Sequence, residues 1–561
     1  MKLSEYDYKA IFLPSYIRKK SSFGTELWSV LFNKILPNEY AFPDARSLLY
    51  NDDVDSFVQR ISQIRTAGID EQNAFLQTIR QDAIVSFNEL ASLINGEQQN
   101  LYIYERLKRL GIGNVSLGQL TDEPEQISQN RTQIKELSHI IEAVRQSYKS
   151  DGTAIHLTYR IEKLAADLNQ ACDVIAVCEP DCSIDEIITI LVKLTRRNLL
   201  NKGMWHFISS KTEVLTKTIV EHNSVHGGKY IANNLKEYFT IFWASLIGGC
   251  MIAVFALFKV EIESWGFSLL GEGLLFGINY ALCFMLVDVL GGIIATKQPA
   301  MTANTLLTKI ALCDSKDAAA KQIANVFADV SKSQFVSFLG NLSVAFFLSI
   351  LISYLFIQNN EQPLVDNDIG TYLVKRNNIA ASGALFYAAV AGVFLSVSGF
   401  IAGYMDNAVL FHRLKQRVAQ KFSKRSVRLK LYNYVLNKLG KFSGSISLGL
   451  LLGLAGAVGM FSGIPFDIRH VAFSSAHIAY GSHAIALDWV SQTGVVTLAS
   501  IFIIGAVNFI VSFVITLVIA LRTTNFKNRD ILYGFFIALK VFLLKPWVFI
   551  LPVGFGNNVK K

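Results

Sequence analysis

The side chains that could do chemistry in this sequence are charged and polar groups inside or beside long apolar runs. Asp288 lies within one apolar run and Lys297 follows it, and Asp467, Arg469 and His470 come directly after another. A charged group at membrane depth is costly unless it is paired, so such residues commonly bind a ligand or relay protons. The pattern predicts a site of this kind, with a purely structural charge network as the alternative.

Asp288 needs a partner most, because a lone carboxylate within an apolar segment is costly unless it is paired or protonated. Lys297, Arg469 and His470 are the candidate partners. A regular helix cannot bring Asp467 and Arg469 together, since side chains two residues apart do not face each other. We therefore expect each of them to find a partner elsewhere or to lie in a turn.

Other polar residues lie in similar surroundings. Asp406 and Asn407 follow an apolar run and are further candidates for a functional role. Single asparagines occur within apolar runs at Asn279, Asn341 and Asn508. For these three, a hydrogen bond to a neighbouring helix is the favoured interpretation, because an amide in a membrane bundle bonds across helices.

The sequence contains no constellation typical of catalysis, and neither a metal nor a cofactor is expected. Cys172, Cys178 and Cys182 are close together, but their spacing contains no C-x-x-C pair and no histidine accompanies them. Reduced cysteines on a helix and in the turn that follows it are the simpler interpretation. The chain is not expected to be an enzyme.

One glycine-rich stretch, residues 444–464, is the centre around which we expect the other helices to pack. It carries no charge and is long enough to span a membrane. Glycines recur in it every three or four residues, which places them along one helix face, at Gly449, Gly453, Gly456, Gly459 and Gly463. A stripe without side chains lets a second helix approach to backbone contact.

The composition agrees with a membrane protein, since 51% of the 561 residues are hydrophobic and only 17% are charged. The sequence predicts an all-α fold with two parts and a tail: a cytosolic helical domain (1–235), a bundle of about six spans (236–523) and an interfacial C-terminal helix (524–561). The six predicted spans are 238–258, 267–295, 335–357, 380–404, 444–464 and 496–521.

The loops carry their basic residues alternately, which predicts the orientation. Loops after the second, fourth and sixth spans are rich in Lys and Arg, whereas the others hold few. Both termini are therefore expected on the cytosolic side of a bacterial inner membrane. Within residues 465–495, the segment 468–487 could also span, but Arg522 would then be outside, so a re-entrant or interfacial helix is preferred.

The N-terminal part reads as a helical bundle. Apolar residues between Leu157 and Ile175 follow the three- and four-residue spacing of a packed helix. Ser183 and Glu186 form a capping box at the start of the next helix. Such a domain either binds a protein partner or supports the membrane part.

The cytosolic loop 405–443 is the most basic part of the chain. Its cations recur at steps of three or four, as one face of a helix would, at Arg413, Arg417, Lys421, Lys424 and Arg428. A helix facing lipid headgroups is the favoured interpretation. A nucleic-acid contact is the alternative, because counterion release favours DNA on any such stripe, but no aromatic platform accompanies it.

Five stretches resemble a bacterial family of multi-pass membrane proteins described as site-specific recombinases. They extend over about residues 220–522, and the two most specific are ATKQPAMTA at 295–303 and GIPFDIRHVAFSSA at 463–476. The others are HNSVHGGKYIANNLKEY at 222–238, SQ and LGN within 333–341, and GYMDN at 403–407. At Ser445 the sequence departs from the family pattern, where an Asn is expected.

The resemblance implies a recombinase by name, but the residues do not support that chemistry. A tyrosine recombinase needs a nucleophile among clustered cations, including an H-x-x-R pair, and none of the nine histidines has Arg at the third position after it. A transport, lipid-handling or envelope role is therefore favoured, with lipids as partners. The alternatives are a DNA recombinase or DNA-binding protein, and a scaffold that recruits a cytosolic partner; nucleic acid is not the expected partner, and the oligomeric state stays open.

Overall fold

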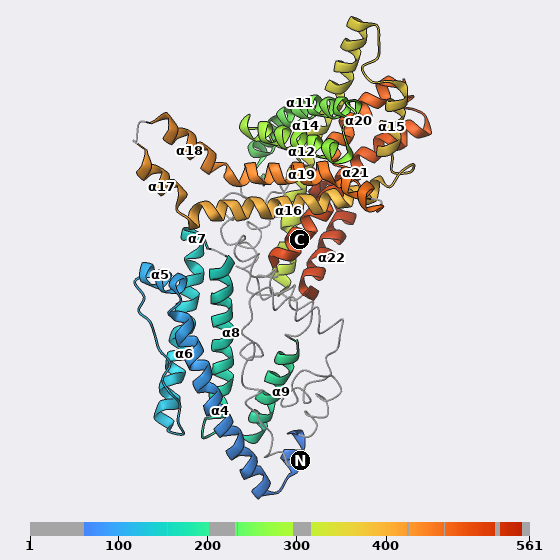
Figure 1. Ribbon diagram of the computed structural model, residues 1–561. Coiled ribbons are helices and arrows are strands. Elements are labelled where there is room, and N and C mark those ends of the chain that lie inside the picture. The colour runs from blue at the N-terminus through green and yellow to red at the C-terminus, as the bar shows by residue number, and fades with distance from the viewer. Residues whose placement is uncertain are drawn as a thin grey trace. The chain divides into compact units, whose positions relative to one another are not determined.

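The structure is a computed structural model that describes residues 61–153, 155–200, 231–232, 234–295, 316–422, 426–464, 466–521 and 528–552. In these ranges every regular element is a helix, so the predicted all-α class is confirmed (Figure 1). The chain divides into two compact units, residues 1–215 and 216–561. The division falls before the boundary that the sequence predicts at residue 235.

The first unit is a helical bundle. The apolar seam of α8 is buried at Leu157, Ile161, Leu164 and Leu168. The predicted capping box is confirmed, because the backbone N–H of Ser183 donates to Glu186 at 2.9 Å and that of Glu186 to Ser183 at 3.3 Å. The α-helices in the described part of this unit are α4 (Ile69–Gln98), α5 (Leu101–Leu110), α6 (Pro124–Gln146), α7 (Tyr148–Asp151), α8 (Ile155–Val177) and α9 (Ile184–Leu200).

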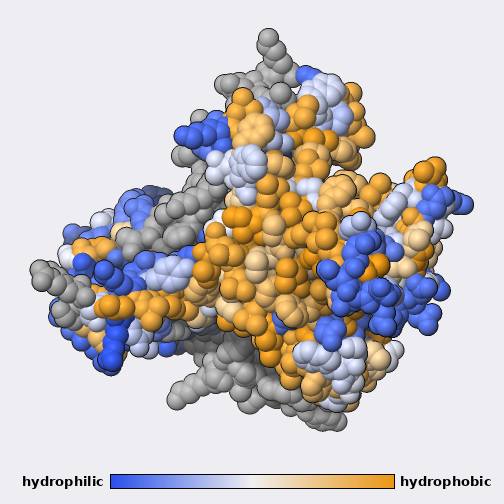
Figure 2. All heavy atoms as spheres, turned by 90° about the horizontal axis from the view of Figure 1, so that it is seen from above, coloured by the Kyte–Doolittle hydropathy of each residue, from blue (hydrophilic) through white to orange (hydrophobic). Residues whose placement is uncertain are grey.

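Among its described residues, the second unit contains six helices that are long and apolar enough to cross a membrane, each matching a predicted span. At least half of each most apolar window is not buried within the unit, as expected of helices that face lipid. Figure 2 shows apolar side chains over the middle of one face and hydrophilic ones toward its sides. The six helices are α11 (Leu235–Ser264), α12 (Leu269–Val289), α14 (Lys316–Asn360), α16 (Ala384–Phe411), α19 (Leu439–Ser462) and α21 (Gln492–Leu521).

Short helices connect the spans at the two ends of this bundle. The helix α15 (Asn367–Asn377) lies between α14 and α16, and α17 (Leu414–Lys421) and α18 (Val427–Asn437) lie between α16 and α19. Because successive spans alternate in direction, α15 and the α17–α18 pair lie at opposite ends (Figure 1). These ends are called the α15 end and the α17 end below.

The glycines of α19 do not share one packing face. A Cβ on Gly449 or Gly453 would overlap the backbone of α12, so these two allow the closest approach of the two helices. Gly459 instead backs onto the carbonyl of Phe466, beyond the helix end. Gly456 has only an ordinary 3.7 Å contact to Asp467, and Gly463 ends the helix in a left-handed conformation with open space around it.

One further helix lies inside the bundle. The helix α20 (Val471–Ala484) is buried at every residue from Val471 to Ser482 and packs against α11, α14, α15 and α21. With 14 residues it is about 21 Å long, shorter than the roughly 30 Å hydrocarbon core of a bilayer. The predicted segment 468–487 therefore contains a short helix surrounded by protein.

The C-terminal helix α22 (Asn528–Leu544) packs along α14, where Gly534 meets Ile323. A short 3-10 turn (Pro546–Phe549) follows, and the Tyr238 hydroxyl on α11 donates to the carbonyl of Ile550 at 3.1 Å. The opposite side of α22 exposes large apolar side chains, among them Phe536 and Leu543.

Candidate functional site

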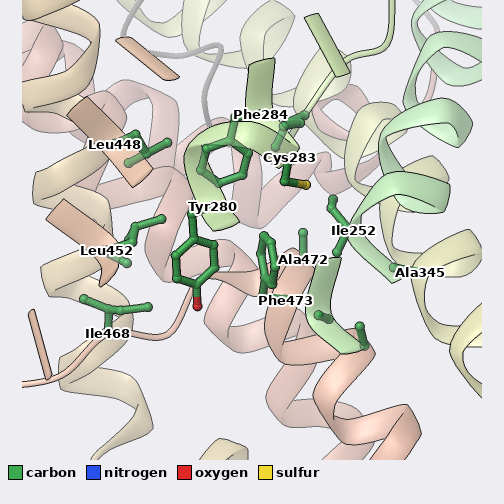
Figure 3. Packing of buried hydrophobic residues seen from close by; sticks show 14 of the residues in the cluster. Ile252, Tyr280, Cys283, Phe284, Ala345, Leu448, Leu452, Ile468, Ala472 and Phe473 are labelled. Atoms are coloured by element: carbon green, nitrogen blue, oxygen red, sulfur yellow. The ribbon is translucent and has the colours of Figure 1, made fainter. Parts of the chain in front are cut away.

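Three aromatic side chains fix the position of α20 in the bundle. Tyr280 and Phe284 on α12 both contact Phe473 on α20, with ring centroids 4.4 and 6.1 Å apart. Figure 3 shows these rings with Leu448 and Leu452 of α19 on one side and Ile252 of α11 on the other. All of these side chains are buried, so the aromatic core holds the start of α20 against α12.

The residues that lead into α20, Phe466 to His470, are not helical. Backbone groups in a membrane interior must find partners, and here they find them in neighbouring segments. The N–H of Arg469 donates to the carbonyl of Tyr387 on α16 at 3.1 Å. The N–H of Ile468 donates to the side chain of Asp467 at 2.7 Å.

Asn508, near the middle of α21, ties this segment to two spans. Its amide donates to the carbonyls of Ala388 at 2.7 Å and Arg469 at 3.0 Å, and its Oδ1 accepts from the N–H of Val471 at 2.9 Å. The non-helical segment is therefore held deep in the bundle, and the predicted interhelical role of Asn508 is confirmed.

The other two asparagines also bond between helices, as predicted. Asn279 on α12 donates to the carbonyl of Phe255 on α11 at 2.9 Å. Asn341 on α14 donates to the carbonyl of Ser245 on α11 at 2.6 Å and accepts from the N–H of Ala295 at 3.0 Å. Both fasten α11 to its neighbours.

A chain of five alternating charges lies at the α15 end. In order, Lys259 and Glu263 come from α11, Arg376 from α15, and Asp467 and Arg469 from the segment before α20. The nitrogen-to-oxygen distances along the chain are 2.9, 3.4, 3.9 and 2.5 Å. We call these five side chains the charged cluster.

The cations of the charged cluster are the more buried members. The side chains of Lys259, Arg376 and Arg469 are 6%, 12% and 6% exposed, against 25% for Glu263 and 32% for Asp467. Each cation also lies over an aromatic ring, at 4.2 to 5.1 Å from the ring centroid: those of Phe276, Tyr372 and Tyr387, respectively. The rings supply favourable electrostatic contact where water is excluded.

Asp467 and Arg469 pair with each other, which a regular helix would not allow. Their segment is non-helical, so two residues along the chain can turn to the same side. The Asp467 carboxylate also lies 3.9 Å from the guanidinium of Arg376, so two cations face it.

Asp288 does not join this cluster, and its pairing with Arg469 or His470 is a wrong expectation. Its carboxylate accepts from the hydroxyl of Ser445 at 3.0 Å, near the α17 end. Ser445 and Gly456, which neighbours Asp467, are about 16 Å apart along α19. Lys297 lies outside the described residues.

The remaining candidates lie in separate places. Asp406 accepts from the backbone N–H of Gly440 at 3.1 Å and so joins α16 to the start of α19, and Asn407 is buried on α16. His470 is buried beside Phe284, with ring centroids 5.8 Å apart. Of these residues, Asp406 joins two helices at the α17 end, and His470 lies in the core.

The basic residues of the loop do not lie on one helix face. Arg413 has a positive φ of 50° and separates α16 from α17, which ends at Lys421. Arg428 lies on α18, and Lys424 lies outside the described residues. The predicted single stripe is therefore wrong, because the chain turns at Arg413 and again after Lys421.

Three members of the charged cluster were not predicted from the sequence. The predicted first span ends before Lys259, whereas α11 continues to Ser264 and places Lys259 and Glu263 one turn apart. That four-residue spacing was a readable signal. Arg376 offered none, because nothing in the sequence tells that α15 packs on α20. His477, buried on α20, lies within electrostatic range of the cluster.

Within the described ranges, no group of three or more His, Cys, Asp or Glu side chains could hold a metal ion. In comparisons with known proteins, a model of the family described as "Site-specific recombinase" matches residues 90–552, more than half of the chain. No curated protein and no solved structure matches.

Proposed function

The chain belongs to the site-specific recombinase family, and we propose that it handles a small solute or a lipid in the membrane instead of recombining DNA. The site we propose is the charged cluster together with the re-entrant segment from Phe466 to Ala484. The family match covers both units, whereas the proposal concerns the membrane unit alone.

The observation that carries this proposal is the non-helical backbone inside the bundle. Such backbone is tolerated at membrane depth only where protein surrounds it or where it lines a cavity. In transporters, broken helices of this kind form the binding site between spans. Here Phe466 to His470 lead from the charged cluster to the buried start of α20, and that start is held by Asn508.

We further propose that the protein lies in the inner membrane of a bacterium with both termini in the cytosol. Loops at the α17 end carry most of the basic residues, which favours the cytosolic side. The charged cluster would then open toward the outside. This orientation excludes any contact between the cluster and chromosomal DNA.

Reporter fusions test the orientation. After Lys375, on α15, only a reporter that works in the periplasm should be active. After Lys316 and Lys430, only a reporter that works in the cytosol should be active. The paired use of alkaline phosphatase and a fluorescent protein gives a positive signal on either side. A cytosolic signal at Lys375 would overturn the orientation and the exposure of the cluster to the outside.

A charge-neutral double variant tests the site. Asp467→Asn with Arg469→Gln removes both charges of one pair and so leaves the net charge of the cluster unchanged. Removing only one partner of a buried pair would cost about 3–5 kcal/mol, because the other charge would lose its partner. We expect the variant to accumulate in the membrane and to melt near the wild-type temperature. Solute exchange should fall at least tenfold.

The measurement uses proteoliposomes loaded with a mixture of small organic and inorganic ions, with losses followed by mass spectrometry. Protein-free vesicles and the exposed-site variant Lys375→Gln are the controls. If the double variant fails to accumulate in the membrane, the pair is structural and the functional role proposed for it is wrong. If no solute moves and the purified protein binds DNA sequence-selectively and salt-resistantly, the recombinase alternative is correct.

A further inference from the structure

We propose that the charged cluster binds a phosphate group, with Arg376 as its principal ligand. The inference rests on the proposed function, because it names the chemistry that the same site would recognise. It concerns binding at the α15 end and does not depend on whether a solute then crosses the membrane.

The net charge of the charged cluster favours an anion. The cluster contains three cations and two carboxylates, so one positive charge is in surplus. Lys259 has Glu263 as its close partner, and Arg469 has Asp467. A surplus charge with little access to water is unfavourable, and an anion would relieve it.

The surplus positive charge belongs to Arg376. Its guanidinium lies 3.4 Å from Glu263 and 3.9 Å from Asp467, so it shares two carboxylates that are already engaged. Its buried Nε has no hydrogen-bond partner among the described residues. Glu272 on α12 is also within electrostatic range, but no ion pair in the described part of the chain joins it to a cation of the cluster.

The position of the charged cluster favours phosphate as that anion. Trp265 at the end of α11 and Tyr372 on α15 are each 53% exposed, and aromatic side chains of this kind gather at the level of lipid headgroups. Arg376 lies against the ring of Tyr372. A guanidinium matches the oxygens of a phosphate with two parallel hydrogen bonds, and phosphates are the anions of that level. The phosphate could belong to a lipid or to a free solute.

The test measures thermal unfolding of the full-length protein in detergent, at constant ionic strength. Three ligands separate the sources: inorganic phosphate, a short-chain phosphatidic acid, and a diacylglycerol of the same chain length that lacks the phosphate. We expect phosphatidic acid or inorganic phosphate to raise the melting temperature in a saturable way, and diacylglycerol to have no such effect. Stabilisation by the lipid alone identifies a headgroup, and stabilisation by inorganic phosphate identifies a solute.

Two variants connect the effect to Arg376. Arg376→Lys keeps the charge but loses the paired donors, and the apparent Kd should weaken at least tenfold; Arg376→Gln should abolish saturable binding. Lys375→Gln removes one charge from the exposed side of the same helix and should leave the Kd unchanged. If Arg376→Gln does not fold, the apparent Kd of Arg376→Lys decides whether Arg376 binds the phosphate.

Two results would overturn the inference. One is a wild-type protein that neither phosphate ligand stabilises, and the other is an Arg376→Lys variant that binds as tightly as Lys375→Gln. Neither result bears on solute exchange in proteoliposomes, so that experiment would still decide whether the proposed function is correct. Conversely, phosphate binding without exchange would leave this inference intact.

Discussion

Gly453→Leu is expected to prevent the membrane unit from assembling. A Cβ at this position would already overlap the backbone nitrogen and Cα of Gly277 on α12, and backbone cannot move aside as a flexible side chain can. Forcing extra volume into a packed interior costs typically about 1–3 kcal/mol, and direct contact with backbone places this variant at or above the top of that range. The variant should fail to accumulate, or should melt far below the wild type.

Gly456→Leu is the matched control, with the same substitution one turn along the same helix. Its Cβ would meet only Asp467 Oδ1 at 3.7 Å, an ordinary contact distance, so this variant should keep most of its stability. Melting curves of the two proteins in the same detergent make the comparison. Equal loss in both would mean that α19 and α12 do not pack through Gly453.

Asn508→Leu is the second substitution with a large expected effect. It leaves the N–H of Val471 and the carbonyl of Arg469 without the partner that Asn508 supplies, at a site with no exposure. Each buried polar group left without a partner costs about 1–3 kcal/mol. Single interhelical bonds in membranes average only about 0.6 kcal/mol, but here one side chain makes three bonds, two of them to backbone at the start of α20.

Asn279→Leu is the corresponding control, because Asn279 is also buried and makes one side-chain hydrogen bond within the described residues, to a carbonyl of α11. We expect it to lower the melting temperature much less than Asn508→Leu does. Limited proteolysis adds a local readout, since release of the re-entrant segment should open cleavage near it only in Asn508→Leu. Similar losses in both variants would contradict the anchoring role of Asn508.

The spans could be predicted from the sequence because length and apolar composition decide them locally. Each of the six apolar runs became a helix, and the capping box at Ser183 formed as its spacing indicates. That the segment 468–487 would not form a further long apolar helix was also expected, since such a span would place Arg522 outside, against the positive-inside pattern. These features depend on residues close together in the sequence.

The charged cluster could not be predicted, because it depends on which helices become neighbours. Glu263 and Arg376 are joined by an ion pair although they belong to different helices. The sequence also gave no sign that Gly456 faces away from α12 while Gly453 faces it, since both fit the same helical spacing. Lys297, Arg469 and His470 were the candidate partners of Asp288, yet the hydroxyl of Ser445, near the start of α19, donates to its carboxylate.

The most direct test of the central claim determines whether the chain between α19 and α21 enters the bundle and leaves it on the same side. Val490, just after α20, is 88% exposed; Tyr372 on α15 is 53% and Leu431 on α18 is 62% exposed. Each is replaced by Cys in a background without the native cysteines, which are Cys172, Cys178, Cys182, Cys250, Cys283 and Cys313.

Intact cells are then treated with a membrane-impermeant maleimide, before and after permeabilisation. We predict that Val490→Cys is labelled in intact cells together with Tyr372→Cys, whereas Leu431→Cys is labelled only after permeabilisation. Labelling of Val490→Cys only after permeabilisation, with Tyr372→Cys accessible throughout, would mean that α20 crosses the membrane and would contradict the re-entrant site.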